Sequence, residues 1–218
     1  MDLRHYDDPF PYITVDNLLS EERISELNKL AQLELDIFNS TDERTAMGKY
    51  VRYLEEDIIP ETNFLIDLLP HRPTHGNIKK LIHWCICPAG DWSSSSGRPH
   101  LDPIAKIHTN TLYLYPNESC GTMLCKNDAP SYVPEGDLAP TTSNPSEYVI
   151  EVPWKKHRVF SINCMDDMWH YFASRGNEPR VTLQSFLVDI DKLVNKKEPW
   201  PSIKDSNWID YHVRTTVR

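Results

Sequence analysis

The strongest constraint on the fold of this sequence is a run of alternating residues at 107–115. Successive residues of a β-strand point to opposite faces of a sheet, so every second side chain shares a face. The run therefore predicts a strand with one polar and aromatic face, formed by Thr109, Thr111, Tyr113 and Tyr115. Further segments have strand character, at 81–86, 147–152, 158–163 and 181–188. The chain from residue 79 to 190 is accordingly predicted to be mainly β.

The N-terminal part of the chain has a different pattern, in which helical segments precede most of the strands. Residues 9–15 indicate a short strand, and Ser20 is placed to cap a helix that begins with two glutamates. A second apolar segment at 58–69 is predicted to be partly helical. Helices followed by many strands predict a jelly-roll barrel braced by N-terminal helices.

The length of 218 residues suits one domain, because an all-β barrel of this size often folds as a single unit. We expect residues 1–78 to form a supporting N-terminal region, residues 79–190 the barrel, and residues 191–218 a C-terminal extension. The pattern of the extension predicts no particular structure, and the sequence gives no prediction of the oligomeric state.

Composition argues against several classes of partner. The net charge is −9, from 23 basic and 32 acidic residues, which disfavours binding to nucleic acid or to an anionic membrane surface. There is no signal-like N-terminus and no apolar run of about 18 residues, the length that a membrane span requires. Five cysteines without a Cys-x-x-Cys pair favour a reducing compartment. We therefore expect a cytoplasmic protein whose partner is a peptide or a small molecule.

A His-x-Asp pair lies just before the alternating run. On a strand, His100 and Asp102 would project to one face, and a distant histidine would complete a two-histidine, one-carboxylate set. That set holds non-haem Fe(II) and leaves positions open for reactants. His108 would lie too far along the same strand to share the ion. The remaining downstream candidates are His157 in a basic turn-like stretch, His170 after a predicted strand and polar turn, and His212 near the end of the chain.

A basic residue follows His170 after ten positions. Arg180 and Thr182 are two residues apart on a predicted strand, so both side chains can face the same interior. A buried guanidinium requires an anionic partner. A dicarboxylic acid would supply one through two parallel hydrogen bonds.

Three segments together resemble the Fe(II)- and 2-oxoglutarate-dependent oxygenases, in particular the prolyl-4-hydroxylase-like branch of bacteriophage and bacterial type. They are His100–Pro116, Gly121–Asp128 and Arg158–Leu187, and the resemblance extends over about residues 79–190. The ordered set of His-x-Asp, strand, Gly-Thr, distal histidine and Arg-x-Thr carries it. The sequence departs from the family pattern at Tyr115-Pro116 and at His157-Arg158, where an asparagine is common.

The resemblance implies a double-stranded β-helix with Fe(II) bound by His100, Asp102 and His170. It implies 2-oxoglutarate as co-substrate, paired with Arg180 and hydrogen-bonded by Thr182 and Tyr113, with O2 as oxidant and ascorbate as a reductant. The expected reaction is hydroxylation of an unactivated C–H. A prolyl group in a peptide or protein is the leading substrate, and a free amino acid or other small molecule is the alternative.

Two other classes of protein remain open at this stage. One is a catalytically silent jelly-roll binding module or phage accessory protein, and the other is a cupin-type isomerase or lectin. The segment at 126–145 is polar and proline-rich, which predicts a long loop that acts as a lid. Lys106 is expected to lie in a solvated connection after the His-x-Asp pair.

Overall fold

The structure of the chain is a computed structural model. The structure describes residues 1–44, 49–70, 77–90, 100–102, 105–126, 149–164, 168–172, 177–192 and 209–210. The predicted lid falls almost entirely outside these residues, since only Lys126 of the segment 126–145 is described.

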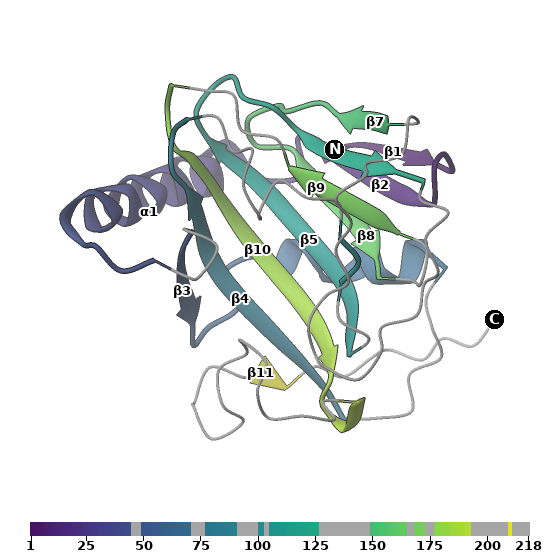
Figure 1. The fold of residues 1–218 in the computed structure, drawn as a ribbon. Helices are drawn as coiled ribbons and strands as arrows, with labels where there is room; N and C mark the ends of the chain where they lie inside the picture. The colour runs from purple at the N-terminus through teal and green to yellow at the C-terminus, as the bar shows by residue number, and fades with distance from the viewer. Residues whose placement is uncertain are drawn as a thin grey trace.

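Two antiparallel sheets form the body of the protein (Figure 1). The larger sheet has the order β1-β2-β8-β5-β10-β4-β11, and β3 also pairs with β4. Its strands are β1 (Asp2–Tyr6), β2 (Tyr12–Asp16), β3 (Tyr50–Leu54), β4 (Ile78–Cys87), β5 (Lys106–Tyr115), β8 (Val159–Asn163), β10 (Arg180–Asp189) and β11 (Ile209–Asp210). The smaller sheet has the order β7-β6-β9, with β6 (Thr122–Cys125), β7 (Val149–Val152) and β9 (Trp169–Phe172).

The two sheets pack face to face through an apolar layer. Tyr113 and Phe160 of the larger sheet share one buried cluster with Leu124 and Val152 of the smaller sheet. Each sheet thus covers one apolar face of the other, as in a jelly roll. This arrangement confirms the predicted double-stranded β-helix, and it places the facing side chains of β5, β10 and β9 in one interior.

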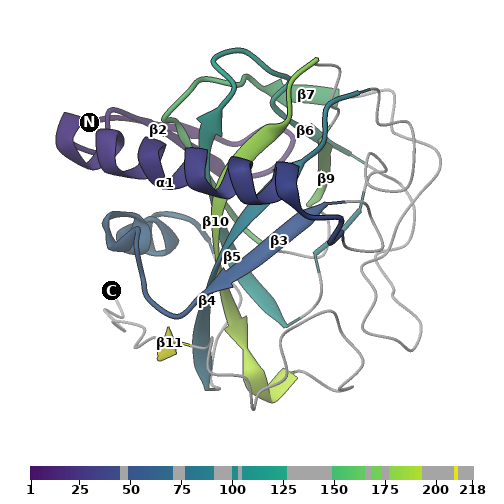
Figure 2. The same cartoon turned by 90° about the vertical axis from the view of Figure 1, so that its left-hand side faces the viewer.

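The α-helix α1 (Glu21–Ser40) covers the outer face of the larger sheet (Figure 2). Ser20 caps it as predicted, because its hydroxyl accepts a hydrogen bond from the backbone N–H of Arg23 at 3.2 Å. Its buried residues Leu27, Ala31 and Leu35 share a cluster with core residues of β4, β5 and β10. The predicted helical part of 58–69 is a 3-10 helix, η1 (Pro60–Leu68).

The sequence patterns did not predict β1, β3, β6 or β9. These strands have four or five residues each, a length at which the sequence signal is weak, although β2, β7 and β8 of the same length were predicted. They form by pairing with other strands of the two sheets: β3 pairs with the ten-residue strand β4, and β9 pairs with β6. β9 carries His170, one of the candidate metal ligands named from the sequence.

Candidate metal centre

Two histidines 70 positions apart meet through their backbones. His100 forms an isolated antiparallel bridge with His170, in which each backbone N–H donates to the other carbonyl oxygen at 3.0 Å. This pairing brings the two imidazole rings to 4.6 Å between centroids. β9 holds His170, and the bridge ties the start of the His-x-Asp segment to that strand.

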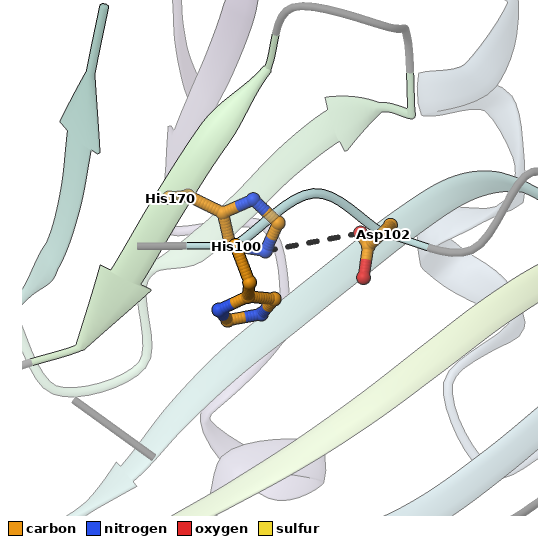
Figure 3. A group of neighbouring side chains, drawn as sticks. All are labelled: His100, Asp102 and His170. Carbon is orange, nitrogen blue, oxygen red and sulfur yellow. Dashed lines mark ion pairs between the residues drawn. The ribbon is translucent and has the colours of Figure 1, made fainter. Parts of the chain in front are cut away.

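Asp102 completes the group, but its backbone conformation differs from the one that the sequence predicted. We expected His100 and Asp102 to share one face of a strand, but His100 lies in the bridge and Asp102 in the irregular segment after it. Asp102 Oδ2 nevertheless lies 3.8 Å from His170 Nε2 (Figure 3). One potential ligand atom from each of the three residues lies within 4.8 Å of the others.

Hydrogen bonds orient the two side chains that face each other in this group. His170 Nδ1 lies 3.0 Å from the carbonyl oxygen of Met168 and donates a hydrogen bond to it, so Nε2 is the ring nitrogen that is turned toward Asp102. Asp102 Oδ1 accepts from Lys106 Nζ at 2.8 Å, and Oδ2 accepts from Cys164 Sγ at 3.1 Å. Such contacts fix the direction of metal ligands.

The expectation of a solvated Lys106 is wrong. Its side chain is 8% exposed, and its ammonium group lies 3.6 Å from the ring centre of Phe186 on β10. Lys106 enters the interior because the pairing of β5 with β10 has a register irregularity between Leu187 and Val188, next to the partner of Lys106. Neither this irregularity nor the position of Phe186 leaves a signal in the sequence around Lys106.

The charges around Asp102 keep it ionised. Burial by itself raises the pKa of Asp102, but Lys106, followed by His170 and His100, outweighs that effect, so the net pKa lies below its ordinary value. Burial, with a further contribution from Asp102, raises the pKa of Cys164 well above its usual range. Cys164 is therefore a neutral thiol donor at neutral pH, and Asp102 is an anionic acceptor.

The three residues fit the donor set of a non-haem iron site. Two imidazoles and one carboxylate form the facial set typical of Fe(II) oxygenases, which leaves positions for other ligands. Among the described residues, this is the one group of three or more His, Cys, Asp or Glu side chains close enough to hold an ion. The other described candidates lie elsewhere: His108 is buried and contacts Asn163 and Asn110, and His157 lies 3.1 Å from Asn28 of α1.

Arg180 lies at the start of β10, buried in the barrel with 4% of its surface exposed. Its guanidinium carbon lies 5.3 Å from the ring centre of Tyr113 and 5.0 Å from those of Trp154 and Phe172. Its Nε is buried without a hydrogen-bond partner, and no acidic side chain of the described part forms an ion pair with it. A buried guanidinium in this state suits a carboxylate ligand.

The two hydroxyl residues predicted beside Arg180 have partners of their own. Tyr113 is fully buried, and its hydroxyl lies 2.8 Å from Thr122 Oγ1. Thr182 donates to the carbonyl oxygen of Cys85 at 3.3 Å and accepts from Gln184 at 3.2 Å. In the pair formed by Tyr113 and Thr122, either hydroxyl can be the donor. The hydroxyl proton of Thr182, in contrast, is already donated to the backbone carbonyl of Cys85.

Several residues of the site were missed or given another role from the sequence. Lys106 was expected to lie in a solvated connection, and Cys164, Phe172 and Trp154 were not among the residues assigned to the site from the sequence. Trp154 stacks on Tyr113 with ring centroids 4.5 Å apart and also covers Arg180. The Gly-Thr pair of the resemblance was the one sequence signal that pointed to Thr122.

The fold is shared with several solved structures. The chain superposes on the epimerase SnoN in complex with Fe3+, alpha ketoglutarate and nogalamycin RO with a TM-score of 0.52 and 14% identity, over 92% of this chain and 91% of that one. It superposes on a Pseudomonas putida prolyl-4-hydroxylase with a TM-score of 0.51 and 10% identity, over 81% and 91%. The chain has the fold of the 2-oxoglutarate-dependent oxygenases. No family model and no curated protein matches the sequence.

None of the described helices has the length and apolar character needed to cross a membrane. The one helix of that length, α1, carries charged residues along its course.

Proposed function

We propose that the protein is an Fe(II)- and 2-oxoglutarate-dependent dioxygenase that hydroxylates an unactivated C–H. The observation that carries the proposal is the combination of two features in one barrel: a two-histidine, one-carboxylate group, and a buried arginine that has no acidic partner among the described residues. The fold of the neighbouring solved structures supports the same reading. Neither a silent binding module nor a cupin-type isomerase requires both features.

Each part of this site has a distinct task. His100, Asp102 and His170 would hold Fe(II), which, together with 2-oxoglutarate and O2, supplies the oxidation that yields succinate, CO2 and a hydroxylated product. Arg180 would bind the far carboxylate of 2-oxoglutarate, with Tyr113 as a hydroxyl donor; Thr182 would first have to release the Cys85 carbonyl. The aromatic side chains around Arg180 exclude water, which strengthens that ion pair.

The prime substrate that we favour is a prolyl group in a peptide or protein. The resemblance to the prolyl-4-hydroxylase branch and the fold shared with the Pseudomonas putida prolyl-4-hydroxylase support this choice. A free amino acid or another small molecule is the second candidate, supported by the equally similar fold of SnoN, whose complex contains nogalamycin RO. We also propose a cytoplasmic location, because all five cysteines are free.

The test is production of succinate from 2-oxoglutarate by the purified chain with Fe(II), ascorbate and O2. A panel of proline-containing peptides and free amino acids is added, and mass spectrometry follows transfer of one oxygen atom from 18O2 into the product. Asp102→Ala is the matched negative control, since it removes one ligand. If wild-type protein loaded with Fe(II) forms no more succinate than Asp102→Ala, with or without the panel, the silent-module reading replaces this proposal.

A further inference from the structure

The two oxygens of the Asp102 carboxylate have different surroundings. Oδ2 is the oxygen nearest to His170 Nε2, at 3.8 Å, and it also accepts from Cys164. Oδ1 accepts from Lys106 Nζ at 2.8 Å. The side of the carboxylate that faces His170 is therefore Oδ2, while Oδ1 is occupied by an ammonium group.

The structure holds Lys106 firmly in this position. Lys106 is the first residue of β5, and its side chain is 8% exposed. The ammonium group lies 3.6 Å above the centre of the Phe186 ring, a cation–π contact that a desolvated lysine makes strongly. A lysine usually keeps its ammonium group in water. The ammonium group of Lys106 is instead buried between the carboxylate of Asp102 and the ring of Phe186, and these two contacts hold it in place.

We propose that Lys106 is a positioning residue for the metal centre, an inference that rests on the function proposed above. By occupying Oδ1, Lys106 limits Asp102 to coordination through Oδ2 and keeps a metal position open for 2-oxoglutarate. Carboxylates bind metal ions through either one or both oxygens, and nothing in the aspartate itself selects between the two modes. A centre with three protein ligands works only while its remaining positions stay free.

The proposal predicts effects of opposite sign on two affinities. Removing the lysine releases Oδ1 and takes away a positive charge close to the metal position, so affinity for a divalent cation does not fall. A carboxylate bound through both oxygens occupies a position that 2-oxoglutarate needs, so affinity for the co-substrate does fall. A lysine with a merely structural role would, when removed, lower both affinities together with stability.

The experiment uses Mn(II) as the metal probe and the full chain. Calorimetry measures the affinity for Mn(II) first, and then the affinity of the Mn(II)-loaded protein for 2-oxoglutarate. The variants are Lys106→Met, which keeps the length of the side chain, and Lys106→Arg, which keeps a charged donor. Lys80→Met is the matched control, because Lys80 is also buried and lies 2.6 Å from Asp57, on the side of the larger sheet that carries η1. The visible spectrum of Co(II)-loaded protein reports the coordination directly.

Lys106→Met is expected to bind Mn(II) at least as tightly as wild type and 2-oxoglutarate about tenfold or more weakly, with an altered Co(II) spectrum. Lys106→Arg and Lys80→Met are expected to keep both affinities within about threefold. If Lys106→Met does not fold, Lys106→Gln carries the same test, because its shorter neutral side chain also releases Oδ1. The proposal is overturned if the neutral variant binds 2-oxoglutarate normally, or if it loses both affinities in parallel. Wild-type protein that binds neither probe would overturn the proposed function instead.

Discussion

Replacing Arg180 with alanine is expected to weaken binding of 2-oxoglutarate by about two to three orders of magnitude. A charge-assisted bidentate contact in a buried pocket contributes roughly 3–4 kcal/mol to binding, which corresponds to that range. Arg180 is 4% exposed and its Nε has no partner among the described residues, so water and neighbouring acids do not compete for it. Metal affinity is expected to persist, because Arg180 is not a ligand.

The same substitution is expected to change the stability of the ligand-free protein much less. Contacts of the guanidinium with three aromatic rings contribute about 0.5–2 kcal/mol each. Burial of a charge without an acidic partner costs several kcal/mol and offsets that gain. In the free protein, the cation–π contacts of Arg180 and the cost of burying its charge oppose each other. In the complex, the ion pair with the carboxylate of 2-oxoglutarate adds to the favourable contacts. The loss therefore appears in binding rather than in folding.

The assay is calorimetric titration of 2-oxoglutarate into Mn(II)-loaded protein, together with thermal unfolding of the free protein. Arg180→Lys tests geometry separately from charge: a point charge cannot copy the guanidinium fork, so a loss of about tenfold is expected. Arg158→Lys is the matched control, since Arg158 is also largely buried but pairs with Asp16 at 2.8 Å and 2.9 Å. Affinity of Arg180→Ala for 2-oxoglutarate within about threefold of wild type, with Mn(II) still bound, would refute the anchor assignment.

Three further predictions concern the ligands, the fold and the response to acid. His170→Ala is expected to lose Mn(II) binding in calorimetry, whereas His157→Ala keeps it; undiminished binding to His170→Ala contradicts the ligand set. Gly121→Ala is expected to lower the free energy of unfolding in urea by about 3 kcal/mol or more, because a Cβ there would lie 1.7 Å from a backbone oxygen of β7; unchanged stability would show that the backbone yields easily. The hydrogen bond from Arg158 lowers the pKa of Asp16 from 3.8 to about 2, so its stabilising contribution is complete above the ordinary pKa and disappears as the pH falls through about 2. Urea titrations should show this loss in wild type, and a shallower loss in Asp16→Asn.

Much of the fold could be predicted from the sequence, because the patterns that mark its strands and its helix involve residues close together in the chain. The alternation at residues 107–115 marks β5, and a serine followed by glutamates marks the start of α1. Both signals depend on the geometry of a few neighbouring residues, which no distant contact alters. The order of His-x-Asp, distal histidine and Arg-x-Thr likewise follows the chain, and it allowed the three members of the candidate metal centre to be named before their positions were known.

The tertiary structure decided how those residues are held. Asp102 faces His170 from an irregular segment rather than from a strand, because a backbone bridge between His100 and His170 sets the approach. Lys106 lies inside the barrel because of a register irregularity in the pairing of β5 with β10 and because Phe186 covers it. The aromatic surroundings of Arg180 come from three separate segments. Pairing register and packing between distant segments depend on the whole chain, so no window of sequence around Lys106 or Arg180 contains that information.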